Sequence, residues 1–205
     1  MCIIAICKRP LTPDEFIHCH ENNSDGWGVA WYTKTENPIC VSKGYLKGSY
    51  YDYKDVIKSV GDMIHIIHFR LTSVGSTCAE LTHPFPLDMK LLRYDALEYE
   101  TRWPVLFHNG HFSEWQAVMI SLAIQQGMIN GKISDTKILA WAIASVMKHS
   151  MAHAEKLLEE LDDKFVLMKP NYDMRIAGQF FDSDDKLVKF SNMSFRRKVF
   201  TLRAV

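Results

Sequence analysis

The sequence predicts an α+β fold in which strands come first, a helical block follows, and strands return at the end. Short apolar runs typical of buried strands recur before residue 110. Apolar residues at helical spacing then predict three helices, over about 113–126, 135–149 and 152–161. The segments after residue 164 alternate as strands do. This order fits a layered architecture in which helices cover two sheets.

Local signals place the remaining elements. The apolar run from Cys2 to Cys7 predicts a buried strand at the start of the chain. Thr12-Pro13-Asp14-Glu15 has the pattern of a capping box with proline at the first helical position, and it predicts a helix to about residue 21. A helix is also expected over 51–60, and a long loop over 72–86. Strands are expected over 28–32, 39–42, 63–70, 105–108, 165–169, 174–177, 187–190 and 198–202.

Composition indicates an ordinary globular protein. The 205 residues suit a single domain spanning 1–205; 47% are apolar, 23% are charged, and the formal net charge is zero. This balance gives no reason to expect nucleic acid or an anionic membrane as a partner. No apolar run is long enough for a transmembrane helix and no secretory leader is recognisable, so a cytoplasmic location is expected. The five scattered cysteines are interpreted as thiols.

Cys2 is the first residue with distinctive chemistry. Its small side chain permits removal of Met1, and the new α-amino group then lies on the same residue as the thiol. An α-amino group has a pKa of about 7.7–8.0, so it is a suitable general base for a thiol near neutral pH. N-terminal nucleophiles use this arrangement. Taken by itself, Cys2 also fits a buried thiol that follows the initiator methionine.

Four further segments follow Cys2 in a characteristic order. They are Asp25-Gly26-Trp27-Gly28, then 68–75 with Thr82-His83-Pro84-Phe85, then His108-Asn109-Gly110, and finally Ser134-Asp135-Thr136. Behind an N-terminal cysteine, this ordered set resembles the class II glutamine amidotransferases. That family includes the glutaminase domains of glucosamine-6-phosphate synthase and of glutamine phosphoribosylpyrophosphate amidotransferase. The resemblance covers residues 2–136 and is closest to stand-alone, single-domain members.

The resemblance implies a four-layer αββα Ntn-hydrolase sandwich and a set of residue roles. Cys2 is the implied nucleophile, and the Asn109 side chain with the Gly110 backbone N–H forms the implied oxyanion hole. Arg70 matches the arginine that grips the glutamine α-carboxylate, a task that suits a guanidinium group. The other implied positions are Asp135 for the substrate α-ammonium, Ser73 and Gly75 for the pocket lining, and Asp25, Gly26 and His83 for support.

Each of these residues also has a purely structural interpretation. Arg70 fits an ion pair at a strand end, and Asn109-Gly110 fits a type I′ turn. Asp135 fits a first-turn acid behind the cap residue Ser134, and His83-Pro84 fits a loop-shaping element. The chain also departs from the family pattern at Ile3, at 22–24 and at Lys137. These departures concern the outer electrostatics of the pocket and the choice of substrate.

The implied reaction is hydrolysis of the glutamine side-chain amide, with no cofactor and no metal. No synthase domain follows in the sequence, so released ammonia would pass to a separate synthase subunit. The alternatives are a hydrolase of another γ-glutamyl small molecule and an inactive glutamine-binding homologue. His18-Cys19-His20 and the pair His149/His153 also offer side chains of the kind that bind zinc. Adjacent helical residues point in different directions, and a helix break is expected between the paired histidines.

Overall fold

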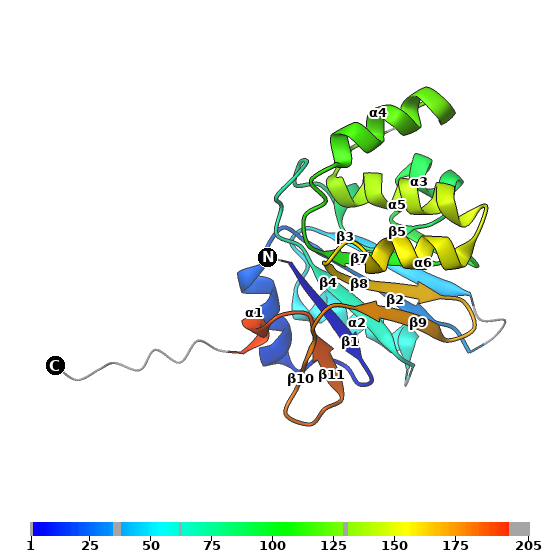
Figure 1. Ribbon diagram of the computed structural model, residues 1–205. Helices are drawn as coiled ribbons and strands as arrows, with labels where there is room; N and C mark the ends of the chain where they lie inside the picture. Colours follow the sequence, from blue (N-terminus) through cyan, green and yellow to red (C-terminus); the bar gives the residue numbers. More distant parts are fainter. Residues whose placement is uncertain (1, 35–37, 62, 129–130, 197–205) are drawn as a thin grey trace.

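A computed structural model describes residues 2–34, 38–61, 63–128 and 131–196. In this part of the chain the fold is α+β, with two antiparallel sheets and six α-helices, an arrangement consistent with a sandwich (Figure 1). The predicted strand over 198–202 and the state of Met1 lie outside the described residues.

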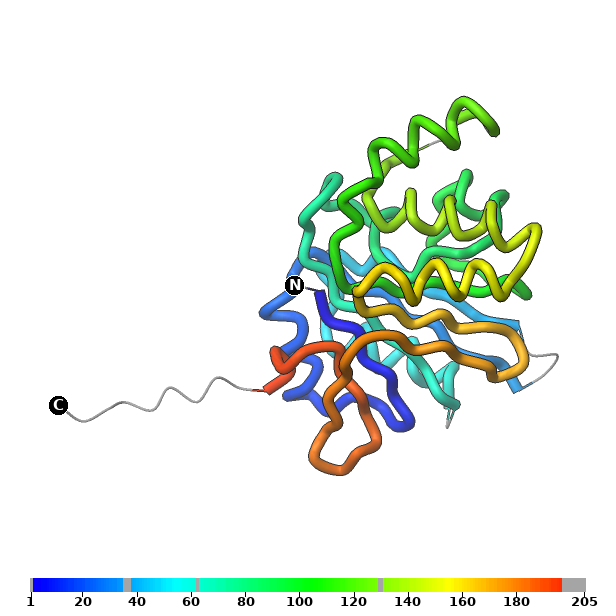
Figure 2. The backbone as a smooth tube through the Cα atoms, viewed as in Figure 1, coloured from blue at the N-terminus to red at the C-terminus, as the bar shows by residue number. Residues whose placement is uncertain are grey.

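The larger sheet has seven strands and contains the start of the chain. Its order is β10 (Phe181–Asp182), β11 (Val188–Phe190), β1 (Ile3–Cys7), β4 (His65–Phe69), β2 (Trp27–Tyr32), β3 (Ile39–Tyr45) and β6 (Glu98–Thr101). Every neighbouring pair in it is antiparallel. The tube in Figure 2 shows β1 beside the chain that returns near residue 190, so the two ends of the described chain meet in one sheet.

The smaller sheet has four antiparallel strands, and most of the helices lie beside it. Its order is β5 (Phe85–Pro86), β7 (Val105–Asn109), β8 (Lys164–Lys169) and β9 (Asp173–Ala177). The helices are α1 (Pro13–Asn22), α2 (Tyr50–Val60), α3 (Met89–Tyr94), α4 (Trp115–Gln126), α5 (Asp135–Met147) and α6 (Met151–Glu159). Figure 1 shows α3, α4, α5 and α6 on the side of the smaller sheet.

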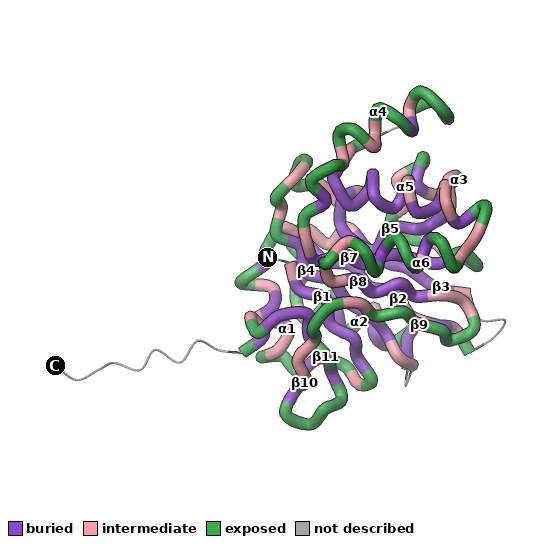
Figure 3. Tube along the Cα trace, viewed as in Figure 1, coloured by how far each residue is buried: buried purple, intermediate pink, exposed green. Residues whose placement is uncertain are grey.

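Three apolar clusters form the core. One joins α5 and α6 to the smaller sheet through residues such as Trp141 and Phe165. A second lies between the two sheets and includes Ile4 and Phe107. The third joins the larger sheet to α1 and α2 and includes Phe16. Burial of apolar surface on both sides of each sheet accounts for the continuous apolar run in β1, whose five residues are all buried (Figure 3).

Most of the predicted elements are confirmed, and the capping box is present as predicted. The Thr12 side chain accepts a hydrogen bond from the Glu15 backbone, and the Glu15 carboxylate accepts one from Thr12 N–H. The predicted long loop also contains a short 3₁₀ turn (Ala79–Leu81) and β5.

Elements absent from the prediction include α3, β6 and β10, which has only two residues. Helix α3 has only six residues, too few to show a helical repeat. Strand β6 lies at the edge of the larger sheet and carries exposed Glu98 and Glu100, so its composition is that of a solvent-facing edge.

Candidate functional site

Strand pairing brings the beginning of β1 beside the end of β4. Ile3 pairs with Phe69, so Cys2 and Arg70 follow as neighbours at the same end of the larger sheet. Strand β7 belongs to the facing sheet, ends at Asn109 and is followed by Gly110, and β1 and β7 are in contact. The described fold therefore brings segments from residue 2 and residue 110 to one place.

One narrow pocket collects most of the residues that the sequence singled out. Its lining is formed by Cys2, Arg70, Leu71, Ser73, Val74, Leu81, His83, His108, Gly110, Ser134, Asp135 and Thr136. Its cavity volume of about 20 Å³ has room for roughly one water molecule. Of the predicted site residues, Asn109, Gly75, Asp25 and Gly26 are not part of this lining.

The Cys2 side chain is held by the backbone of the neighbouring strand end. Its Sγ accepts a hydrogen bond from Leu71 N–H at 3.3 Å and donates to the Leu71 carbonyl at 3.4 Å. The Cys2 carbonyl oxygen accepts a bond from the Asn192 side chain at 2.7 Å. Burial raises the pKa of the Cys2 thiol, although the Leu71 bond and the charge of Arg70 oppose that rise. A nearby base is therefore needed to generate the thiolate.

Arg70 is a buried cation for which the described residues provide no carboxylate within ion-pair distance. It is 4% exposed, and its guanidinium donates to the carbonyls of Ser76 at 3.0 Å and Val74 at 3.4 Å. Burial lowers the pKa of Arg70 from its ordinary value. A buried charge that is bonded only to neutral carbonyls is a costly arrangement, and an anionic ligand would reduce that cost.

Asp25 and Gly26 fix the chain that follows Arg70. The Asp25 carboxylate accepts a bond from Thr72 N–H at 2.7 Å, and Asp25 N–H donates to the Arg70 carbonyl. Arg70 N–H in turn donates to the Gly26 carbonyl at 2.8 Å. The sequence led us to expect support for the nucleophile strand itself. These contacts hold segment 70–72 instead, and that segment contacts the Cys2 sulfur.

Asp135 begins α5 with its carboxylate directed at backbone donors. Ser134 is the cap residue, and its side chain accepts a bond from Lys137 N–H. The Asp135 carboxylate accepts bonds from Thr136 N–H at 2.8 Å and Phe112 N–H at 3.2 Å. Ser134 therefore caps the helix, and the Asp135 carboxylate lies at the pocket wall instead of serving as the cap.

Asn109 and Gly110 are adjacent, but their contacts differ. Neither has a positive φ, so they do not form the type I′ turn that the sequence left open. Gly110 faces the pocket, whereas the Asn109 side chain donates to Ser191 Oγ at 2.8 Å. That bond uses one of the two amide hydrogens of Asn109.

Ser191 and Asn192 are site residues that sequence reasoning missed. Ser191 Oγ accepts bonds from the Asn109 side chain and from Ile4 N–H, so it joins the two sheets beside Asn109. Asn192 holds the Cys2 carbonyl. A serine and an asparagine after a strand resemble any turn, and no spacing in the sequence links them to residue 2.

Lys43 is a second buried cation that the sequence did not single out. Its ammonium donates to the carbonyls of Thr82 at 2.8 Å and Glu80 at 3.0 Å, and it lies 4.5 Å from the centre of the Phe85 ring. Burial lowers its pKa to about 7. Lys43 thereby fixes the turn that leads into His83.

Two buried histidines, His83 and His108, line the pocket, and a third, His68, contacts both of them. The rings of His68 and His83 are 3.8 Å apart, and His68 Nε2 donates to the His108 carbonyl at 3.2 Å. Burial lowers the pKa of His68 to about 3 and that of His83 well below its ordinary value. Both rings are therefore neutral at physiological pH, and they add no positive charge to that of Arg70.

Gly75 and the exposed loop around it form the rim of the pocket. Gly75 has φ +84°, and a side chain there would overlap the Ile133 carbonyl, so glycine is required on both counts. Ser73 lines the pocket from the same loop. Because this loop also supplies the carbonyls that bind Arg70, its position determines how open the pocket is.

A larger groove of about 460 Å³ lies elsewhere, over the outer face of β2, β3 and β6 beside α2. Carboxylates of Asp55, Glu98 and Glu100 line it together with Trp31. No basic side chain accompanies them in the lining, whereas the smaller pocket combines a thiol, a cation and a carboxylate. Chemistry rather than size therefore identifies the candidate site.

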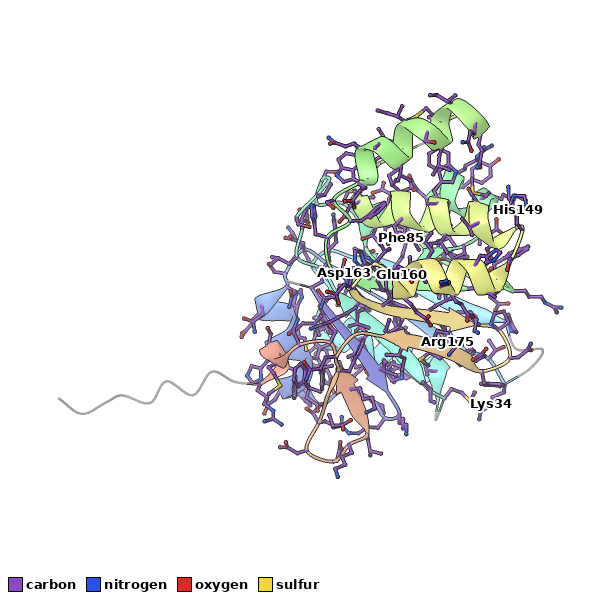
Figure 4. All side chains as sticks on the ribbon, in the orientation of Figure 1. Lys34, Phe85, His149, Glu160, Asp163 and Arg175 are labelled. Atoms are coloured by element: carbon purple, nitrogen blue, oxygen red, sulfur yellow. The ribbon has the colours of Figure 1, made fainter. Side chains whose placement is uncertain are left out.

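The candidate zinc ligands lie on α1 and around the junction of α5 with α6. Cys19 belongs to the apolar core. His149 lies in the junction between α5 and α6 (Figure 4), and His153 lies within α6. Within the described ranges, no three His, Cys, Asp or Glu side chains gather in the way that a metal ion would require. Over the same ranges, no helix has the length and apolar content needed to span a bilayer.

Comparisons with known proteins add no assignment. A scan against models of known protein families finds no match, and no curated protein matches the chain.

Acid is expected to destabilise the fold through His65. This residue is 1% exposed, its Nε2 lies 3.0 Å from the Tyr53 hydroxyl, and burial lowers its pKa to about 4. Between pH 6.5 and 4 the unfolded chain binds a proton at this position and the folded chain does not, so stability falls as the pH falls. The loss by pH 4 is on the order of 3 kcal/mol.

Urea unfolding of the wild type and of His65→Gln at pH 7 and at pH 4.5 measures this contribution. Glutamine keeps an acceptor for Tyr53 but does not titrate, so the free energy of unfolding should depend less on pH in the variant. The exposed His153→Gln is the matched control. An equal pH dependence in the wild type and His65→Gln would contradict the prediction.

Proposed function

We propose that this chain is a glutaminase or amidotransferase subunit of the class II type, which hydrolyses the side-chain amide of glutamine. The observation that carries the proposal is the meeting of Cys2, Arg70 and Asp135 in one pocket. An amino-acid substrate carries an α-carboxylate and an α-ammonium group. Arg70 and Asp135 provide one charge complementary to each, and Cys2 provides a nucleophile for the side chain.

The proposed reaction begins at the N-terminus. Once Met1 is removed, the α-amino group of Cys2 takes the thiol proton, and the thiolate attacks the amide carbon of glutamine. The Gly110 N–H and the remaining amide hydrogen of Asn109 stabilise the oxyanion. The protonated α-amino group of Cys2 then returns the proton to the leaving nitrogen. Ammonia departs, and a thioester between Cys2 and the glutamyl group remains. Water hydrolyses the thioester, which releases glutamate and restores the thiol.

Substrate binding on this proposal requires movement of the rim. The cavity is far smaller than the 300–1,000 Å³ usual for small-molecule sites. In this structure the carbonyls of Val74 and Ser76 accept the hydrogen bonds of the Arg70 guanidinium. A substrate carboxylate would replace them, because a charged acceptor binds a guanidinium more strongly than a neutral one. The exposed loop over 71–77 would move outward at the same time.

The proposal extends to the fold and to the fate of ammonia. We propose the four-layer αββα arrangement of Ntn hydrolases, with the three apolar clusters as the interfaces between layers. We further propose that the domain spans residues 1–205 and acts in the cytoplasm. We also propose that the released ammonia passes to a separate synthase subunit.

A glutaminase assay on protein whose N-terminus is verified as Cys2 by mass spectrometry tests the proposal. Equal release of ammonia and glutamate from L-glutamine is expected, with far slower release from asparagine, whose shorter side chain cannot reach Cys2 while its α-groups are held. A parallel panel of other γ-glutamyl amides identifies a preferred substrate of that class. Lack of turnover of every compound in the panel would refute the proposed activity and leave a binding protein.

A further inference from the structure

A carboxylate outside the predicted motifs lies against the pocket. Asp163 lies in the turn between α6 and β8 (Figure 4). Because Asn109 pairs with Lys164 across β7 and β8, Asp163 comes opposite Gly110 at the end of that ladder. A Cβ atom at Gly110 would overlap the Asp163 carboxylate. The acid therefore lies directly beside the proposed oxyanion donor.

Asp163 is also bonded to a buried ring. Its Oδ2 is 3.2 Å from His108 Nε2, and the side chains of Asp163 and His108 are 28% and 1% exposed. The His108 ring stacks on Phe165, with 4.7 Å between ring centres and an interplanar angle of 10°. The ring is thereby held in one plane, with the carboxylate at one of its nitrogens.

The second nitrogen of His108 continues the chain of contacts toward the substrate. Nδ1 lies 3.0 Å from Thr136 Oγ1, and Thr136 N–H donates to the Asp135 carboxylate at 2.8 Å. Asp163 can only accept a hydrogen bond when ionised, so it selects the form of a neutral His108 ring with the proton on Nε2. Nδ1 is then an acceptor, and the Thr136 hydroxyl donates to it.

We infer that Asp163 is a positioning residue for the substrate α-ammonium group. The Thr136 hydroxyl lies 3.0 Å from His108 Nδ1 and 3.5 Å from Asp135 Oδ1. By making Nδ1 an acceptor, Asp163 favours donation of the hydroxyl proton to the ring over donation to Asp135, which leaves that carboxylate oxygen available to the substrate. It also anchors the first turn of α5 at the end of β7. This inference rests on the proposed function, because the α-ammonium group is that of the amino-acid substrate. Comparable second-sphere carboxylates orient histidines at other sites.

The test compares two substrates that differ only in the α-amino group, L-glutamine and glutaramate (the same acid amide without that group). Asp163→Ala should raise the KM for glutamine about five- to tenfold, roughly the value of one hydrogen bond, with kcat within about twofold. The KM for glutaramate should change less than twofold. Asp163→Asn keeps an acceptor oxygen for Nε2–H and should restore the KM for glutamine. Asp162→Asn, at the exposed neighbouring position, is the control.

A structural readout keeps the inference separate from the proposed activity. Nitrogen-15 spectra of the histidine rings should show the Nε2–H form at His108 in the wild type and Asp163→Asn, and loss of that form in Asp163→Ala. An unchanged ring form in Asp163→Ala, or equal KM increases for both substrates, would overturn the inference while glutamine hydrolysis by the wild type stood. An inactive wild type would overturn the proposed function and the substrate part of this inference, and the ring spectra would still decide the part that concerns His108.

Discussion

Replacement of Cys2 by alanine is expected to abolish glutamine hydrolysis, with a loss in kcat on the order of 10⁴–10⁶-fold. The variant keeps an α-amino group at the same position but has no atom to form the thioester. Its fold should survive, because among the described residues the thiol makes hydrogen bonds only with the Leu71 backbone at the rim of the pocket. Steady-state ammonia release and a thermal melt on the same preparations separate the two effects.

Cys78→Ala is the matched control for this experiment. Cys78 is a second partly exposed thiol, located where the rim loop meets the 3₁₀ turn, and it does not line the pocket. Its removal should leave kcat within about twofold. Protein that retains Met1 should be as inactive as Cys2→Ala, because the base is then a peptide nitrogen. Equal activity with and without Met1 would refute the role of the amine while leaving the thiol as nucleophile.

Much of the fold followed from local signals because those signals are strong in this sequence. The capping box at Thr12 and the apolar run of β1 each depend on a few adjacent residues. Helix α3 and strand β6 were missed because one is very short and the other is a charged edge. In both cases the element exists through its neighbours in the fold, which sequence periodicity does not record.

The candidate site likewise contains residues that the sequence predicts and residues that it does not. Cys2, Arg70 and Asp135 belong to motifs that the sequence displays, and the fold places them in one pocket. Asp163 and Ser191 belong to no motif. Asp163 contacts β7 through the pairing of β7 with β8, and Ser191 contacts it from the other sheet, so neither contact can be recognised from nearby residues in the sequence. Asn109 also shows the limit of a motif. The residue stands at the position that the resemblance implies, but its amide is bonded to Ser191.

Replacement of Gly110 by alanine is expected to lower kcat by about 10²–10³-fold, the usual effect of losing one oxyanion donor. The backbone of Gly110 does not have a positive φ, so alanine causes no conformational strain. The added methyl group would instead overlap the Asp163 carboxylate, and the backbone must move to relieve that contact. When the Gly110 N–H is displaced, it no longer donates a hydrogen bond to the oxyanion. Arg70 and Asp135 stay in place. The loss should therefore fall on kcat more than on KM.

A double variant provides the internal control for this explanation. In Gly110→Ala combined with Asp163→Ala, the second change removes the group with which the new methyl collides. The pair should regain part of the kcat lost in Gly110→Ala, so the two effects should be strongly non-additive. Additive losses would mean that the collision with Asp163 is not the cause. The same kinetic comparison measures the coupling between Gly110 and Asp163. Each single substitution changes one of these two contacting residues, and the double variant changes both.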